Sequence, residues 1–185
     1  MPLIRCGPVK PCVLVLAGPP CSGKSTVGAL LAGTDALHVE VDLVLGLLIP
    51  RSNRSDPDRL LAYRIASRFA RPIVEAERPV LLDCTYSKAV YREDLRCSCA
   101  GLPTYVVEFW VDVPTALKRF KRRGPHPAID LTDQIVTDRV RDYPYSETAF
   151  RVDSNLPATT IVSTVVSWLE QTGAQDLKSW VSHGR

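Results

Sequence analysis

The 185-residue sequence contains no apolar run long enough to cross a membrane, which takes about 20 consecutive apolar residues in a helix. Asp42 interrupts the longest candidate, which extends from Val39 to Ile49. At the N-terminus, Pro2, Arg5 and Pro8 break up the segment in which a signal peptide would need its apolar core. We therefore expect a protein that does not enter a membrane and that works in the cytoplasm.

Cysteine motifs and strong charge are also missing. The six cysteines form no C-x-x-C pair and have no zinc-ligand spacing, which favours reduced thiols over a disulfide framework. The net charge of +3 is too small to indicate nucleic acid as a partner by itself. There is no internal repeat and no low-complexity segment. The length and the ordinary composition predict one domain over residues 1–185.

Apolar residues gather in five short runs that alternate with helical stretches. The runs are nearly continuous in Val, Leu and Ile, which is typical of parallel strands buried on both faces. The sequence therefore predicts an α/β protein whose parallel sheet has helices on both sides. The predicted strands are Cys12–Ala17, Leu37–Val41, Pro79–Leu82, Thr104–Val111 and Ala149–Val152.

The longest predicted helix covers residues 58–77. In it, apolar residues recur at every fourth position, and this spacing predicts one buried stripe along the helix. The residues of this stripe are Leu61, Ile65, Phe69 and Ile73.

Three shorter helices are predicted over residues 114–123, 130–141 and 157–171. The tail of residues 173–185 is predicted to be loosely held outside a core of about residues 12–170. The alternative is that Leu177, Trp180 and Val181 dock on the domain as another turn or two of helix.

Residues 18–25 read Gly-Pro-Pro-Cys-Ser-Gly-Lys-Ser and directly follow the first predicted strand. This is the G-x-x-x-x-G-K-[ST] loop, whose inward backbone N–H groups and following helix bind the phosphates of ATP or GTP. Lys24 is expected to reach the β- and γ-phosphates, and the hydroxyl of Ser25 to bind Mg²⁺. The predicted nucleotide-binding residues are Gly18, Pro19, Pro20, Cys21, Ser22, Gly23, Lys24, Ser25 and Thr26.

Asp42, Asp83 and Asp112 follow predicted strands at their carboxyl ends, where parallel sheets bind ligands. Asp83 has the apolar-run-then-acid pattern of a carboxylate near Mg²⁺, and the alternative is a cap on the following turn. Asp42 is a candidate catalytic residue that accepts a hydrogen bond from an acceptor hydroxyl and aims its oxygen at the γ-phosphorus. The alternative for Asp42 is an N-cap for residues 43–48.

Residues 118–123 hold five cations in six positions. Arg119 and Arg123 are one helical turn apart and therefore share a face. We predict that they stabilise the transferred phosphate from a lid of about residues 115–142 that closes over the nucleotide. The alternative is a solvated basic face.

A second basic cluster extends from Arg51 to Arg71, and its six arginines and two aspartates leave a charge of +4. Arg64 is a candidate substrate residue in it, and the alternative is a helix face that only serves solubility. Arg92, nine residues beyond Asp83, either contacts a phosphate or substrate group or pairs with a neighbouring acid. We assign Cys21 no catalytic role but expect its alkylation to inactivate the protein, unless the thiol points into the core.

These motifs in their order resemble the P-loop kinases related to the kinase domain of bacteriophage polynucleotide kinase, and they are similar to the chloramphenicol phosphotransferases, a group of small kinases with an AAA-type domain. The resemblance covers about residues 12–170. It implies a three-layer α/β/α P-loop NTPase fold with a five-stranded parallel sheet, a helical lid and bound Mg-ATP. It also implies that Asp42 activates the acceptor hydroxyl and that Arg119 and Arg123 are the lid arginines.

The preferred function is an ATP-dependent kinase that phosphorylates a hydroxyl of a small polar molecule, such as an antibiotic, a nucleoside or a sugar-like metabolite. One alternative is a polynucleotide 5′-hydroxyl kinase, although few aromatic residues accompany the arginines to stack on bases. A further alternative is a regulatory ATPase without an acceptor. The acceptor, the choice between ATP and GTP, and the oligomeric state stay open.

Overall fold

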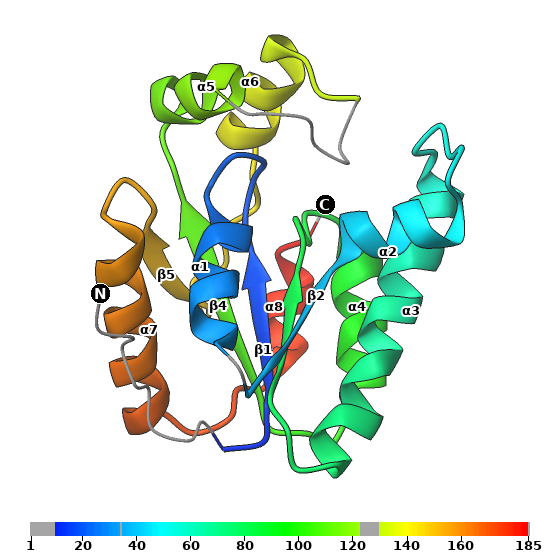
Figure 1. Cartoon of the computed structure of the whole chain (residues 1–185), viewed down its shortest axis with the longest axis vertical. Helices are drawn as coiled ribbons and strands as arrows, with labels where there is room; N and C mark the ends of the chain where they lie inside the picture. Colours follow the sequence, from blue (N-terminus) through cyan, green and yellow to red (C-terminus); the bar gives the residue numbers. More distant parts are fainter. Residues whose placement is uncertain (1–9, 34, 123–129, 185) are drawn as a thin grey trace.

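The computed structural model describes residues 10–33, 35–122 and 130–184. Its centre is a five-stranded, all-parallel sheet with the strand order β2-β3-β1-β4-β5 (Figure 1). Each strand overlaps one of the five predicted runs, so the predicted parallel α/β fold is confirmed. The strands are β1 Val13–Ala17, β2 Leu37–Glu40, β3 Val80–Asp83, β4 Thr104–Trp110 and β5 Phe150–Asp153.

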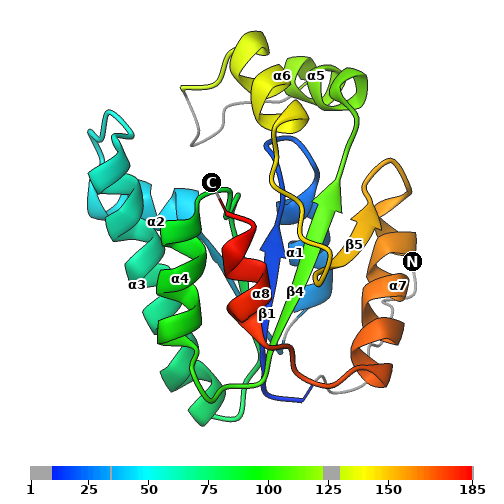
Figure 2. The same cartoon turned by 180° about the vertical axis from the view of Figure 1, so that it is seen from behind.

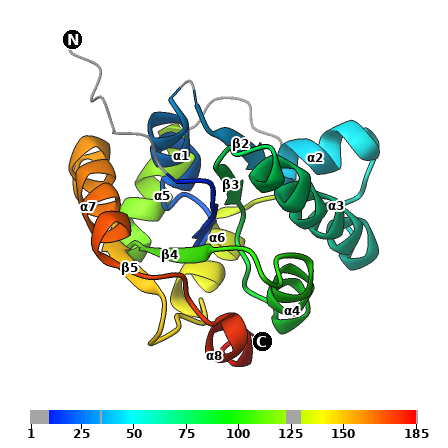
Figure 3. The ribbon, with the colours of Figure 1, turned by 90° about the horizontal axis from the view of Figure 1, so that it is seen from below.

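Helices cover both faces of this sheet, which makes three layers. α1 and α7 lie on one face, and α3, α4 and α8 lie on the other (Figures 2 and 3). α5 and α6 pack against each other beyond the carboxyl ends of the strands (Figure 1). The helices are α1 Lys24–Ala32, α2 Val41–Leu48, α3 Asp56–Glu75, α4 Ala89–Ser98, α5 Val113–Arg122, α6 Asp133–Arg141, α7 Ala158–Gln171 and α8 Leu177–Ser182. None of the helices in the described part of the chain has the length and apolar character needed to span a membrane.

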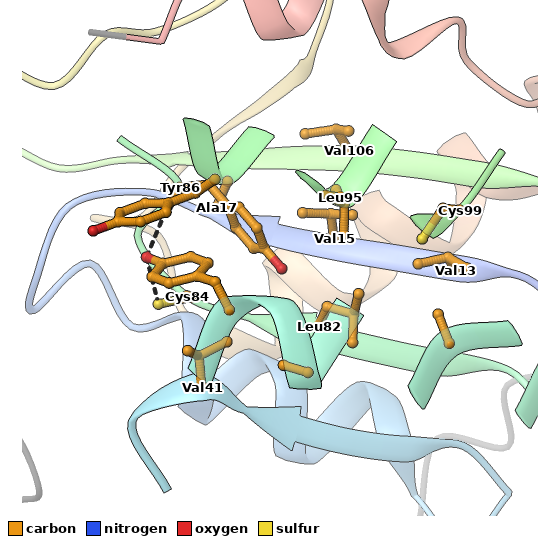
Figure 4. Packing of buried hydrophobic residues seen from close by; sticks show 14 of the residues in the cluster. Val13, Val15, Ala17, Val41, Leu82, Cys84, Tyr86, Leu95, Cys99 and Val106 are labelled. Atoms are coloured by element: carbon orange, nitrogen blue, oxygen red, sulfur yellow. Dashed lines mark hydrogen bonds between the residues drawn. The ribbon is translucent and has the colours of Figure 1, made fainter. Parts of the chain in front are cut away.

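The central strand β1 is buried at every position. Because successive side chains of a strand point to opposite faces, it contributes to two cores. Val13, Val15 and Ala17 pack under α3, α4 and α8 (Figure 4), whereas Leu14 and Leu16 pack under α1 and α7. A strand that is covered on both faces needs apolar residues without interruption, and this is the pattern that made β1 recognisable in the sequence.

The buried face of α3 differs from the predicted stripe. Leu61 and Phe69 are each 45% exposed, so these two residues of the predicted stripe are wrong, whereas Ile73 does pack against the core. The face that α3 turns to the core consists of small residues and one aromatic residue, namely Ala62, Tyr63, Ala66, Ser67 and Ala70. Small side chains let the helix axis lie close to its neighbours, and Tyr63 stacks on Tyr91 of α4 with ring centroids 3.9 Å apart.

The C-terminal segment is docked on the sheet by α8, which the sequence analysis held only as an alternative to a loose tail. Leu177 is 6% and Trp180 is 1% exposed. The indole Nε1 of Trp180 donates a hydrogen bond of 2.9 Å to Glu108 on β4. The tail is therefore part of the core rather than an appendage.

Arg92 of α4 is completely buried beneath α8. Its guanidinium donates to the backbone carbonyls of Tyr86, Pro144 and Trp180 at 2.7–2.8 Å. It also lies 3.4 Å from the carboxylate of Glu108, whose pKa is raised by burial. Arg92 therefore connects α4, β4 and α8 inside the core, and the expectation that it contacts substrate is not retained.

Candidate active site

A cavity of about 480 Å³ lies at the carboxyl ends of the strands. Its wall is formed by the loop after β1, the start of α2, the loop before α3, the end of β3, and side chains of α5, α6 and α7. Parallel α/β sheets bind their ligands at this edge. Most of the residues that the sequence analysis selected lie on this wall.

The loop between β1 and α1 has the backbone of a phosphate-binding loop. Gly18, Cys21 and Gly23 have φ angles of 150°, 61° and 86°, in the region that L-residues rarely adopt. A Cβ atom on Gly18 would lie only 2.8 Å from the carbonyl oxygen of Phe109, so only glycine fits there. Such a run of turned peptides makes a nest of N–H groups for an anion.

Lys24 begins α1 and is 9% exposed. Its ammonium group donates to the carbonyl of Pro19 at 2.8 Å and to the hydroxyl of Ser22 at 3.3 Å, so it lies folded over the loop. The N-cap residue of α1 is Gly23, and no side chain caps the first turn of this helix. Of the predicted nucleotide-binding residues, the structure places Pro20, Cys21, Ser22, Gly23, Lys24, Ser25 and Thr26 on the cavity wall.

Ser25 and Asp83, the predicted metal residues, both line the cavity. Asp83 is 4% exposed at the end of β3, which pairs directly with β1. Among the described residues there is no group of three or more His, Cys, Asp or Glu side chains that could hold a metal ion. A hydroxyl and a carboxylate suit Mg²⁺ when nucleotide phosphates supply further oxygen ligands, so these two residues fit that ion.

His38 of β2 was not selected from the sequence. Its Nε2 lies 3.3 Å from Oδ2 of Asp83, so it restricts the orientation of that carboxylate. Gly28 of α1 makes room for this imidazole, because a Cβ there would lie 2.6 Å from Nε2 of His38 and 2.9 Å from Leu16. No sequence motif surrounds this single histidine in a short strand, so its contact with Asp83 could be found only from the tertiary structure.

Gly28→Ala is expected to lower the free energy of unfolding by about 1–3 kcal/mol, because the added methyl group overpacks the space that His38 fills. Gly46→Ala in α2 is the matched control, since a Cβ at Gly46 would meet nothing within 4 Å. On helix propensity alone the control is expected to gain about 0.5–1 kcal/mol. Urea titrations of the two variants measure both values. Equal stabilisation by both substitutions would contradict the close approach of α1 and β2.

Asp42, the predicted catalytic residue, lies in the first turn of α2 and lines the cavity. The N-cap position belongs to Glu40, and no side-chain cap bond is present, so the alternative role of Asp42 as the N-cap is not realised. The carboxylate of Asp42 pairs with the guanidinium of Arg54 from the loop before α3. Asp42 is therefore turned toward the cavity and held there by a cation.

Four charged side chains form a network beside Asp42. Asp130, just before α6, lies 2.9 Å from Nε of Arg54, 2.6 Å from Nη2 of Arg59 and 3.7 Å from Nη2 of Arg139. The three arginines all line the cavity. The network joins the loop before α3, the start of α3 and the α5–α6 pair.

The basic cluster of residues 51–71 is thus divided by the fold. Arg54 and Arg59 reach the cavity, whereas Arg64 pairs with Asp94 of α4 on the outer surface, with its side chain 48% exposed. Arg64 does not line the cavity, and the expectation that it binds substrate is not retained. Charge alone does not tell which turn of a helix lies at the edge of the sheet, so the sequence did not distinguish Arg54 and Arg59 from Arg64.

Arg119 of α5, one of the two predicted lid arginines, lines the cavity. Its guanidinium donates to the carbonyl of Cys21 at 3.3 Å and to the carbonyl of Ser154 after β5. It therefore bridges the phosphate-binding loop, the α5–α6 pair and the loop before α7. Arg123, the second predicted lid arginine, lies outside the described residues.

The described cysteines form no disulfide with one another, and they differ in access. Burial raises the pKa of Cys12 to about 11 and the pKa of Cys84 and Cys99 to about 12, so these thiols stay protonated. Cys97 is exposed, and Cys21 is half-buried on the cavity wall. Cys21 is therefore the thiol at the phosphate-binding loop, and its side chain packs partly against the apolar cluster of α5 and α6.

Alkylation with N-ethylmaleimide is expected to abolish the binding of Mg-ATP, because Cys21 packs between the phosphate-binding loop and the apolar cluster of α5 and α6, where an added group would displace the loop. Cys21→Ser should bind ATP and resist the inactivation, and bound Mg-ATP should protect the unmodified protein. Cys97→Ser is the matched control and should be inactivated like the wild type. Calorimetry measures the binding and mass spectrometry the modified residue. Full ATP binding by protein that is modified at Cys21 would contradict the placement of this thiol.

The comparisons with known proteins agree with this fold. Residues 13–143, more than half of the chain, match the family described as AAA domain, so the chain belongs to this family. No curated protein sequence matches the chain.

Several solved structures share the fold. A sugar kinase from a Janibacter species is 16% identical with a TM-score of 0.68, and the alignment covers 94% of this chain and 98% of that one. A gluconokinase from Sinorhizobium meliloti is 22% identical, with a TM-score of 0.66 and coverages of 87% and 93%. An APS kinase from Mycobacterium tuberculosis is 19% identical, with a TM-score of 0.70 and coverages of 89% and 100%. At these identities the likeness establishes the three-layer P-loop fold.

Proposed function

We propose that the protein is an ATP-dependent phosphotransferase that moves the γ-phosphate of Mg-ATP to a hydroxyl of a small polar molecule, such as an antibiotic, a nucleoside or a sugar-like metabolite. The observation that carries the proposal is the cavity that Lys24, Asp83 and Asp42 line together. A phosphate-binding loop, a carboxylate beside the metal and a carboxylate for the acceptor are the parts that phosphoryl transfer to an alcohol uses.

The solved structures of similar fold support the same class of reaction. Two of them are a sugar kinase and a gluconokinase, and the third is an APS kinase in complex with AMPPNP and APS. These are small kinases of nearly the same length as this chain, because the alignments cover 93–100% of them.

Five residues of the cavity have assigned roles in the proposed reaction. Lys24 leaves its bonds to the loop and binds the β- and γ-phosphates, while Arg119 stabilises the negative charge of the transferred group from the other side. Mg²⁺, held by Ser25 with Asp83 beside it, would neutralise charge on the phosphate oxygens when bound. Asp42 accepts the proton of the acceptor hydroxyl as its oxygen bonds to the γ-phosphorus and the bond to the β-phosphate oxygen breaks.

A transfer assay with [γ-³²P]ATP and Mg²⁺ tests the proposal. The acceptors are nucleosides, aminocyclitols, sugars and sugar acids, hydroxylated amino acids, and DNA and RNA with 5′-hydroxyl ends. Labelling of a small molecule supports the proposal, and labelling of oligonucleotide ends only would replace it with a polynucleotide kinase. ATP hydrolysis that no compound stimulates would favour a regulatory ATPase. A folded protein that gives no calorimetric signal with Mg-ATP or Mg-GTP would refute all three.

A further inference from the structure

The acceptor side of the cavity is lined by Asp42, Glu40, Arg54, Arg59 and Arg139. The ion pairs of its three arginines involve two carboxylates, those of Asp42 and Asp130. Three guanidinium groups share the single carboxylate of Asp130, and Arg54 alone also reaches Asp42. The side chains of Arg54 and Arg59 are only 7% and 20% exposed. Residues 123–129, which join α5 to this region along the chain, contain no Asp or Glu.

The role of Asp42 leaves these arginines with fewer carboxylate partners. An acceptor hydroxyl that donates a hydrogen bond to Asp42 competes with Arg54 for the same carboxylate. A guanidinium with almost no access to water cannot give up a carboxylate without cost, because water does not replace the lost charge partner. The molecule that displaces Arg54 from Asp42 is therefore most favourable when it brings a negative group of its own.

We infer that the acceptor carries an anionic group, a phosphate or a carboxylate, and that Arg54 and Arg59 bind this group while Asp42 holds the hydroxyl. The inference rests on the proposed function and specifies its substrate class. Arg54 and Arg59 have planar guanidinium groups that match two oxygens of a carboxylate or a phosphate. In this structure, Asp42 and Asp130 pair with these guanidinium groups in the way that the anionic group of the acceptor would.

The first experiment measures anion binding without any transfer. Protein saturated with Mg-ADP, which occupies the phosphate-binding loop, is titrated with inorganic phosphate and with acetate at constant ionic strength in a calorimeter. We expect at least one of the two anions to bind with a Kd of about 1 mM or below, and the one that binds distinguishes a phosphate from a carboxylate site. Arg59→Gln is expected to weaken this binding by about tenfold or more, the effect of losing a charge-assisted hydrogen bond.

Arg68→Gln is the matched control, because Arg68 is exposed on the same helix and does not line the cavity. It should bind the anion like the wild type, and both variants should keep the wild-type affinity for Mg-ADP. Arg59 is chosen over Arg54 because it does not touch Asp42 in this structure. If neither anion binds to the wild type, or if Arg59→Gln binds as tightly as Arg68→Gln, the inference is wrong.

The second experiment separates the inference from the proposed function. Phosphate transfer is compared within pairs of acceptors that differ by one charge, gluconate against glucitol and glucose 6-phosphate against glucose. Preference for a charged member that Arg59→Gln removes supports the inference. Equal transfer to the neutral member of each pair overturns the inference and leaves the kinase function standing. If the protein binds the anion at Arg59 but transfers phosphate to no acceptor, the proposed kinase function is refuted and the anion site is supported.

Discussion

Asp42→Asn is expected to reduce acceptor-dependent phosphate transfer by about 10²–10⁴-fold, the usual contribution of a positioned general base. The amide keeps the shape of the side chain but no longer accepts the proton of the acceptor hydroxyl. The affinity for Mg-ATP should stay unchanged, because Lys24 and the phosphate-binding loop remain intact. Steady-state assays with the acceptor found in the transfer screen, together with calorimetry for ATP, measure the two effects.

Glu40→Gln is the matched control for this prediction. Glu40 also lines the cavity two residues before Asp42, so the substitution removes the same charge from nearly the same place. Its loss of transfer should be less than about tenfold, since no proton passes to it. Similar losses of transfer in the two variants would indicate that the reaction needs only negative charge at this edge of the sheet and no proton acceptor at Asp42. Unchanged ATP hydrolysis by Asp42→Asn, with no compound that stimulates the wild type, would favour the regulatory ATPase.

Arg92→Met is expected to lower the free energy of unfolding by about 3–5 kcal/mol, the cost of leaving one partner of a buried ion pair uncompensated. The substitution leaves the carboxylate of Glu108 beneath α8 without its guanidinium. It also removes the donor to the carbonyls of Tyr86, Pro144 and Trp180. Guanidinium chloride titration followed by tryptophan fluorescence measures the loss, because Trp180 reports on the docking of α8.

Arg96→Met is the matched control on the same helix. Arg96 pairs with Glu93 at the surface, where the pair is exposed to solvent, and we expect a much smaller loss of stability. A double variant with Arg92→Met and Glu108→Gln should recover part of the loss, because it removes the uncompensated charge. A double variant as unstable as Arg92→Met would show that the lost hydrogen bonds, and not the charge, are the cause. Equal losses for Arg92→Met and Arg96→Met would contradict the central position of Arg92.

Short segments of sequence were enough to predict some parts of this protein. The strand β1, the loop of residues 18–25 and the start of α1 are contiguous in the sequence. Their apolar run and their glycine and lysine motif can therefore be recognised from neighbouring residues alone. Asp42 and Asp83 could be predicted as cavity residues for a related reason. Parallel strands end at one edge, so polar residues that follow two strands meet there.

Other predictions failed because the decisive contact joins distant residues. The periodicity of α3 identified a helix but chose Leu61 and Phe69 for its buried face, since the pattern gives large residues more weight than alanines. The charge of residues 51–71 indicated a basic region, but Asp130 and Asp94 decide which arginine faces the cavity and which faces outward. Arg92 looked like a site residue because an arginine at the surface and one in the core are identical in sequence.

The sequence by itself determined the parallel sheet and the phosphate-binding loop, because strand burial and backbone turns depend on neighbours along the chain. Only the tertiary structure decided that Arg54 and Arg59 face Asp42, that His38 holds Asp83 and that α8 closes the core over Arg92. Each of these contacts brings together side chains from separate elements. Which charges and hydrogen-bond donors pair depends on which side chains lie close together in space, and the packing of the layers sets those distances.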